Sequence, residues 1–268
     1  METVPSGYAD IVYSKAAGVA TITINRPRVY NAFTLNTIAE LTAAFSDASA
    51  DEEIGVIVLT GAGGNFCTGG DVSWEHELSP STGRIMLEKL MPLAFLMRNS
   101  GKPVIAKVRG FCIGGGNELN LLCDLTIAEE GAKFGQAGPR MGSVPIWHGT
   151  QLLPLLVGEK RAREIVYLCR QYTARQALEM GWVNAVVPES DLDATVSQWC
   201  EEILDKSPQA IRTAKTSINF LGDLLTPSIN HGGAILALMH GTDEFHEGTD
   251  AFKEKRKPDF RSYRKRGT

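Results

Sequence analysis

The sequence predicts an α/β fold with a largely parallel sheet, followed by a helical C-terminal region. Short apolar, β-branched segments alternate with longer amphipathic segments up to Gly158, and helical patterns dominate the rest of the chain. A chain of 268 residues is near the upper size for a single hydrophobic core. We therefore expect one large α/β unit with a smaller C-terminal appendage.

Four segments are expected to be strands because each is apolar, β-branched and bounded by turn residues: 18–25, 55–61, 103–110 and 125–130. Residues 35–51 predict a helix, since Ile38, Leu41 and Phe45 repeat on one face, and residues 85–99 predict another. Helical patterns after Gly158 cover 159–169, 173–181 and 191–208. We divide the chain into a core of residues 1–200 and a C-terminal helical segment of residues 201–268.

Composition gives no indication of function. The chain is 43% hydrophobic and 22% charged, with a net charge of -4, which is ordinary for a globular protein in solution. The first ten residues are polar, and no membrane span is visible, so we expect a cytoplasmic protein without membrane contact. The five cysteines form no CxxC pair, which favours reduced thiols and no metal site.

The C-terminal end is locally basic despite the negative net charge. Its cations are Lys253, Lys255, Arg256, Lys257, Arg261, Arg264, Lys265 and Arg266. A solvated tail and a site for a phosphate-bearing ligand both explain such a cluster. Nucleic acid is the weaker interpretation, because no aromatic-rich RNA-binding motif accompanies the cations.

Two glycine-rich turns follow predicted strands. They are "FCTGGD" at residues 66–71 and the three glycines at 114–116. Glycine lets backbone approach a ligand closely, and two converging N–H groups make an oxyanion hole. The alternative is that these glycines only turn the chain and permit close helix packing.

Glu118 follows the second turn in an otherwise apolar run, "NELNLLC". We expect it in the first turn of a helix, where the helix dipole favours a carboxylate. It is either a simple helix cap or a carboxylate in a buried cleft, whose raised pKa would suit proton transfer. The residues alone leave both interpretations open.

Four motifs together resemble the enoyl-CoA hydratase/isomerase (crotonase) superfamily over nearly the whole chain. They are "INRPRVYNAF", "VIVLTGAGGNFCTGGD", "PVIAKVRGFCIGGGNELNLLCDLTIA" and "FGQAGPRMG". The resemblance implies a spiral of ββα units with a C-terminal helical region, assembled as a homotrimer or as a homohexamer made of two trimers. It also implies an acyl-CoA substrate and no cofactor beyond the coenzyme A moiety of that substrate.

The same resemblance implies roles for individual residues. The N–H groups of Gly70 and Gly115 would form the oxyanion hole for the thioester carbonyl, and Glu118 matches the first catalytic glutamate of the hydratases. The remaining matches are to coenzyme A: Val29, Tyr30, Cys67 and Thr68 would line its channel, and Phe252 and Lys255 would cover its adenine and phosphates.

The sequence departs from the hydratase pattern at Gly138, which occupies the position of the second catalytic glutamate. "FGQAGPRMGS" and the segments around residues 164–188 and 250–260 resemble instead a branch that acts on ring-bearing or ring-closing acyl-CoAs. That branch includes 1,4-dihydroxy-2-naphthoyl-CoA synthase and 2-ketocyclohexanecarboxyl-CoA hydrolase, and the core is also similar to 6-oxocyclohex-1-ene-1-carbonyl-CoA hydrolase. Pro145 stands where the first two enzymes carry a functional aspartate.

Other side chains are candidates for the site. His148 takes the position of a tyrosine in the loop that holds the second catalytic group, where an imidazole could act as a base, or only satisfy the loop backbone. His240 also replaces a tyrosine of that branch. Ser143 and Trp147 are candidate substrate contacts, although Ser143 matches a loop-forming serine. Either Glu75 or Glu77 could bind substrate, but a solvated turn is the favoured interpretation.

Three functions remain open at this point. The leading hypothesis is an acyl-CoA enzyme that adds water to a cyclic enoyl- or oxoacyl-CoA, with hydration or ring-opening C–C hydrolysis as the outcome. The second is an ordinary enoyl-CoA hydratase or double-bond isomerase that uses Glu118 alone. The third is a non-catalytic protein that binds coenzyme A or RNA, suggested by Gly138 and the basic tail.

Overall fold

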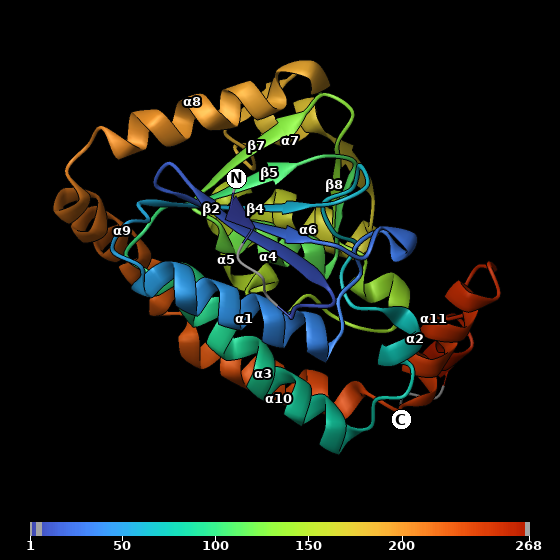
Figure 1. Cartoon of the computed structure of the whole chain (residues 1–268). Helices are drawn as coiled ribbons and strands as arrows, with labels where there is room; N and C mark the ends of the chain where they lie inside the picture. Colours follow the sequence, from blue (N-terminus) through green and yellow to red (C-terminus); the bar gives the residue numbers. More distant parts are fainter. Residues whose placement is uncertain (1, 4–6, 266–268) are drawn as a thin grey trace.

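A seven-stranded sheet forms the centre of the protein (Figure 1). The computed structural model describes residues 2–3 and 7–265. The strands, in their order across the sheet, are β1 (Glu2–Thr3), β2 (Ile11–Ala16), β3 (Val19–Ile24), β4 (Val56–Gly61), β5 (Val104–Val108), β7 (Leu125–Glu129) and β10 (Ala185–Val187). The strands from β3 to β10 are parallel, and β1 and β2 add an antiparallel edge. The four predicted strands are confirmed as β3, β4, β5 and β7.

A second, three-stranded sheet was not predicted. It contains β6 (Phe111–Ile113), β8 (Lys133–Gly135) and β9 (Gln171–Thr173). Each strand has three residues, which is too short for an alternating pattern to be recognised. β9 and β10 also interrupt the C-terminal half of the chain, for which the sequence analysis gave only helices.

Eleven α-helices occur in the described part of the chain. They are α1 (Leu35–Ala50), α2 (Val72–Glu75), α3 (Pro80–Asn99), α4 (Gly115–Leu122), α5 (Gly149–Val157), α6 (Glu159–Leu168), α7 (Ala174–Glu179), α8 (Leu192–Leu204), α9 (Pro208–Asp223), α10 (Thr226–Met239) and α11 (Asp243–Lys253). Single 3-10 turns are η1 (Pro27–Val29), η2 (Gly138–Met141), η3 (Glu189–Asp191) and η4 (Tyr263–Lys265). α3 begins before its predicted start because Ser79 caps it, with Oγ accepting from the Thr82 N–H at 3.3 Å.

Helices cover both faces of the main sheet (Figure 1). Alternate residues of β4 point to opposite faces, as a strand requires. Val56 and Val58 pack against Leu192 and Val196 of α8 on one side. On the other side the core continues into α1 and α3, with Leu59 among its buried residues. The α/β class, with its C-terminal helical region, is therefore confirmed.

The C-terminal helices are attached to the core by polar contacts. The Lys215 ammonium of α9 is buried and donates to the Met97 carbonyl at 2.7 Å, the Lys102 carbonyl at 2.9 Å and the Asp124 carboxylate at 2.7 Å. The expected division at residue 200 falls inside α8, which runs continuously through it. The helices α9, α10 and α11 follow α8 along the chain. No helix in the described ranges is long and apolar enough to span a bilayer.

Candidate active site

The two glycine-rich turns lie directly against each other. A Cβ placed on Gly69 would be 2.8 Å from the Gly115 nitrogen and 3.5 Å from the Gly115 Cα. Phe33 ties the first turn in place, because its N–H donates to the Gly69 carbonyl at 2.8 Å and its carbonyl accepts from the Asp71 N–H at 2.9 Å. The fold therefore brings together two backbone segments that are 45 positions apart in the numbering (Gly70 to Gly115).

The second turn consists of glycines because its backbone lies very close to Phe33 and Cys67. Gly114 has φ 57° and ψ -126°, a conformation that side chains disfavour. A Cβ on Gly115 would lie 2.7 Å from Phe33 Cζ, and one on Gly116 would collide with the Cys67 carbonyl. The glycines thus let the start of α4 pack against the first turn without intervening side chains.

The N–H groups of Gly70 and Gly115 donate no hydrogen bond to another residue in the described part of the chain. For Gly115 the reason is general, since the first amides of a helix have no partner in the preceding turn. The helix dipole adds a partial positive charge at the same end. Two such donors in adjoining turns can stabilise a negatively charged oxygen, which is what the sequence analysis expects of them.

Glu118 lies in the first turn of α4, as predicted, and its side chain is buried. Its Oε1 accepts from the Gly149 N–H at 3.3 Å, so the start of α5 closes over the carboxyl group. Burial raises the pKa of Glu118 well above its usual range, although backbone hydrogen bonds from Gly149 and Trp147 act in the opposite direction. Glu118 is therefore a buried acid suited to proton exchange rather than a solvated helix cap.

The position of Glu75 was not expected from the sequence. Glu75 ends α2, and its carboxylate presses against Gly70, where a Cβ would collide with Oε1. Burial, and then the charge of Asp71, raise the pKa of Glu75 to about 7. Its charge in turn contributes to the raised pKa of Glu118. The only signal in the sequence was a carboxylate shortly after a glycine turn, which does not distinguish a site residue from a solvated one.

The position that lacks the second hydratase glutamate is physically closed. A Cβ on Gly138 would lie 2.9 Å from Val144 Cα and 3.0 Å from Pro145 Cδ. The Ser143 N–H donates to the Gly138 carbonyl at 2.8 Å, which holds the two segments together. Ser143 thus shapes this loop through its backbone, and a larger residue at 138 would need the loop to move.

His148 begins α5 with φ 69° and lies next to the amide that binds Glu118. The residue is 9% exposed, and its Nδ1 has no hydrogen-bond partner within the described ranges. Burial, followed by the charge of Arg98, lowers the pKa of His148 to about 4, so the ring is neutral at physiological pH. No hydrogen bond joins the ring to Glu118 in the residues described, and its catalytic role stays a prediction.

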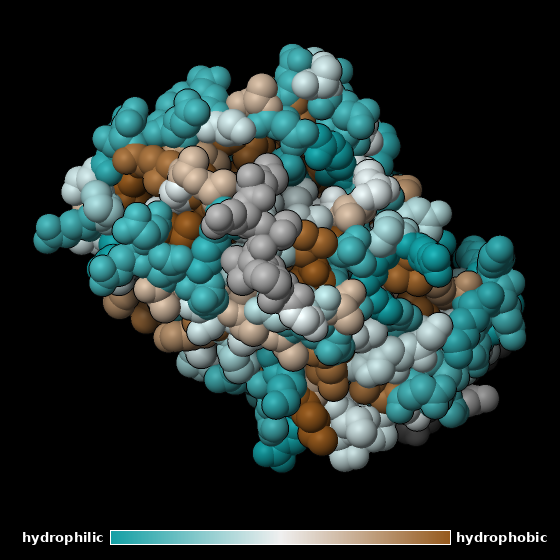
Figure 2. Space-filling model, in the orientation of Figure 1, coloured by the Kyte–Doolittle hydropathy of each residue, from teal (hydrophilic) through white to brown (hydrophobic). Residues whose placement is uncertain are grey.

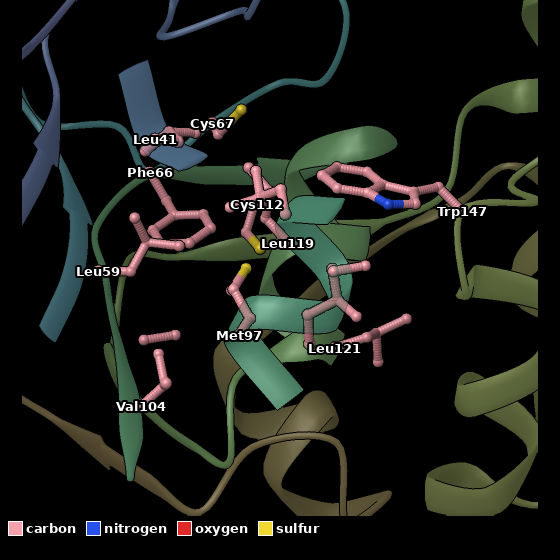
Figure 3. Close-up of a cluster of buried hydrophobic side chains, with 14 of the residues drawn as sticks. Leu41, Leu59, Phe66, Cys67, Met97, Val104, Cys112, Leu119, Leu121 and Trp147 are labelled. Atoms are coloured by element: carbon pink, nitrogen blue, oxygen red, sulfur yellow. The ribbon is translucent and has the colours of Figure 1, made fainter. Parts of the chain in front are cut away.

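Trp147 and His240 are both core residues. The Trp147 indole N–H donates to the Leu90 carbonyl at 3.2 Å, and its ring packs edge-to-face on Phe33 with the centroids 5.9 Å apart. Figure 3 shows the same ring among the buried apolar side chains. His240 packs against Phe245 at 5.0 Å, and burial lowers its pKa to about 4. Both were candidates for contact with substrate, and that assignment stays a prediction.

Three of the expected coenzyme A contacts form one exposed cluster. Tyr30 is 55% exposed, its ring packs edge-to-face with Phe111, and its carbonyl accepts from Thr68 Oγ1 at 3.3 Å. Val29 is exposed beside it. Cys67 differs, because its thiol is fully buried and burial raises its pKa to about 12. Its N–H donates to the Phe111 carbonyl and its carbonyl accepts from the Ile113 N–H, so Cys67 is not exposed at this surface and its contact with coenzyme A stays a prediction.

Phe252 and Lys255 line a separate basic pocket of about 1090 Å³. Its other residues are Val72, Ser73, Arg140, Ala251, Lys253, Arg256, Lys257, Pro258, Phe260, Arg261 and Arg264. Arg256 is neutralised by Glu247 and Glu254, whereas Lys255 has no ion pair in the described chain. The face drawn in Figure 2 is hydrophilic over α11. Of the basic tail, Arg266 lies outside the described residues.

No group of three or more potential metal ligands occurs within the described ranges. All five cysteines are free thiols in the structure. The carboxyl groups of Glu75 and Glu118 can transfer protons, and they accompany two backbone amides that can hold an oxyanion.

The chain is similar to known proteins over most of its length. The family model described as enoyl-CoA hydratase/isomerase matches residues 14–264. A solved enoyl-CoA hydratase/isomerase from Xanthobacter autotrophicus Py2 is 31% identical, with a TM-score of 0.85, and the match covers 92% of this chain and 94% of that one. An enoyl-CoA hydratase from Bacillus anthracis is 32% identical, with a TM-score of 0.76, and 93% and 98% of the two chains are covered.

Proposed function

The chain belongs to the enoyl-CoA hydratase/isomerase family, and from this premise we propose that it adds water to a ring-bearing enoyl- or oxoacyl-CoA, with hydration or ring-opening C–C hydrolysis as the outcome. The observation that carries the proposal is the buried carboxyl group of Glu118 behind the Gly70 and Gly115 turns. A thioester enolate carries its charge on one oxygen, and two preorganised amides lower the energy of that state.

The glycine amides and Glu118 have different roles in this reaction. The free N–H groups of Gly70 and Gly115 bind the thioester oxygen and hold the negative charge that develops on it. Glu118, whose proton is retained to higher pH than that of an ordinary glutamate, exchanges a proton with the acyl carbon or with water. The glutamate missing at Gly138 leaves the hydratase pair of carboxylates incomplete, and the ring-active branch motifs support a cyclic acyl group over a linear one.

Hydration or double-bond isomerisation of a linear enoyl-CoA is the second candidate. It is favoured by the descriptions of similar solved structures, including an enoyl-CoA hydratase from Mycobacterium avium subsp. paratuberculosis K-10 that is 28% identical, with a TM-score of 0.85, and covers 94% of this chain and 98% of its own. 1,4-Dihydroxy-2-naphthoyl-CoA synthesis is less well supported, because Pro145 replaces the aspartate expected there.

Incubation with a matched pair of thioesters tests which acyl group is used. We expect cyclohex-1-ene-1-carbonyl-CoA and its 6-oxo derivative to gain one or two waters, with crotonyl-CoA turned over at least tenfold more slowly in kcat/KM. The measurement is product mass by liquid chromatography and mass spectrometry. Turnover of crotonyl-CoA alone would replace the ring-bearing substrate by a linear one.

The basic pocket gives a second expectation. We infer that Phe252 and Lys255 bind the adenosine phosphate end of coenzyme A, since phosphates favour unpaired cations in a partly apolar setting. Lys255→Glu should raise KM for an acyl-CoA by roughly tenfold, equivalent to about 1.4 kcal/mol. The acyl-pantetheine thioester, which lacks those phosphates, should react equally with both proteins. Lys160→Glu, on the exposed face of α6, is the control. An equal rise in KM for the Lys160→Glu protein would show that the effect comes from the change in net charge and not from a contact of Lys255 with the phosphates.

Assembly as a trimer or as two trimers is also part of the proposal. Large apolar side chains of α9 and α10 are exposed in the isolated protomer, including Ile218 at 77% and Leu238 at 69%. Such side chains are typical of surfaces that another subunit covers.

A further inference from the structure

Glu75 is positioned by the local structure of the first glycine turn. α2 begins immediately after the turn, and Asp71 caps it by accepting the Ser73 N–H at 3.1 Å. One turn of helix then directs Glu75 back to the glycine from which the chain departed. Its carboxylate contacts Gly70 so closely that no Cβ fits there.

Among the described residues, none is paired with the carboxylate of Glu75. Within the described residues it makes no hydrogen bond and no ion pair, although the side chain is half-buried. The neighbouring Asp71 differs, because Arg26 lies 3.1 Å from its carboxylate. Burying an unpaired carboxylate costs stability, and groups of this kind concentrate at functional sites.

Glu75 and Glu118 act on each other electrostatically. Burial is the main cause of the raised pKa of Glu118, and the charge of Glu75 raises it further. The two carboxyl groups come from different turns, Glu75 beside Gly70 and Glu118 in the helix that starts at Gly115. A thioester oxygen held by both amides would therefore lie between the turn that Glu75 contacts and the helix that carries Glu118.

We propose that Glu75 is the second catalytic carboxylate of this site and that it works with Glu118 in place of the glutamate absent at Gly138. The proposal rests on the proposed function, because it assigns a residue to the same water-adding reaction. The ligands of the site in this reaction are an α,β-unsaturated acyl thioester and one water molecule.

The proton balance of the step requires two carboxyl groups in opposite protonation states. Ionised Glu75 removes one proton from water as the oxygen forms a bond to the β-carbon. The electrons of the double bond move onto the thioester oxygen, which the Gly70 and Gly115 amides stabilise. Protonated Glu118 then delivers its proton to the α-carbon, the carbonyl reforms, and proton exchange between the two carboxyl groups restores the starting state.

Glu75→Gln tests this assignment, with Glu77→Gln as the matched control. Glu77 is in the same segment but exposed, so its change alters charge by the same amount outside the site. We expect Glu75→Gln to lower kcat by about 10²- to 10⁴-fold and Glu77→Gln to leave it within a factor of two. Retained turnover in a folded Glu75→Gln protein would overturn the proposal.

Two further measurements distinguish a catalytic role of Glu75 from a structural one, and failure of the proposed function from failure of the Glu75 assignment. Calorimetric titration with a saturated acyl-CoA should give the same Kd for wild type and Glu75→Gln, since the amides and the coenzyme A contacts are untouched. Loss of binding together with activity would make Glu75 structural and contradict a catalytic role. If wild-type protein adds water to none of the thioesters, the proposed function fails. If wild type is active and Glu75→Gln is equally active, only the assignment of Glu75 fails.

Discussion

Glu118→Gln should lower kcat for water addition by about 10²- to 10⁴-fold while Kd for a saturated acyl-CoA stays unchanged. Glutamine has the same shape, and its Oε1 can still accept the Gly149 N–H that holds α5 in place. What it loses is the proton that the buried carboxyl group exchanges. Glu118→Gln therefore abolishes proton exchange at this position and keeps the local structure.

Steady-state kinetics and calorimetry on the same preparations measure the two effects separately. Glu130→Gln is a suitable control, because that carboxylate is exposed in the loop after β7. A parallel loss of kcat and of affinity in Glu118→Gln would contradict the assignment, because it would mean that the residue binds substrate rather than transferring a proton.

Gly115→Pro should cost about 10²- to 10³-fold in kcat, the usual effect of losing one oxyanion donor. Proline is compatible with the first position of a helix, where Gly115 lies, but it has no N–H. Gly115→Ala provides the control, since it also places a Cβ near Phe33 Cζ and keeps the N–H.

The measurement to compare is kcat of Gly115→Pro against kcat of Gly115→Ala. If the alanine variant is much more active than the proline variant at similar thermal stability, the N–H group carries the effect. Equal activities would show that crowding against Phe33, rather than loss of the donor, accounts for the change.

Local features of the fold could be predicted from the sequence. The strands at β3, β4, β5 and β7 and the helix α1 are continuous apolar or periodic segments whose pattern depends on a few neighbouring residues. Glu118 was placed correctly in the first turn of α4 because it follows the three-glycine turn directly. β6, β8 and β9 escaped detection because pairing between distant segments, not local pattern, makes them strands.

The site was only partly predictable, because its distinctive features are tertiary contacts. The resemblance gave Gly70, Gly115 and Glu118, whereas the contact between Glu75 and Gly70 depends on how tightly α2 returns to the turn. The absence of a carboxylate at Gly138 was visible in the sequence. Its physical cause, the packing of Val144 and Pro145 against that position, was not.

Incorporation of labelled water is the most direct test of the account. Wild-type protein is incubated with the cyclic and linear enoyl thioesters in ¹⁸O-water, and the acyl product is analysed by mass spectrometry beside Glu118→Gln. We predict that wild type forms a product carrying one or two labelled oxygens, and that the variant forms at least 10²-fold less of it. Absence of labelled product with every thioester, or equal labelling by the variant, would contradict water addition through Glu118.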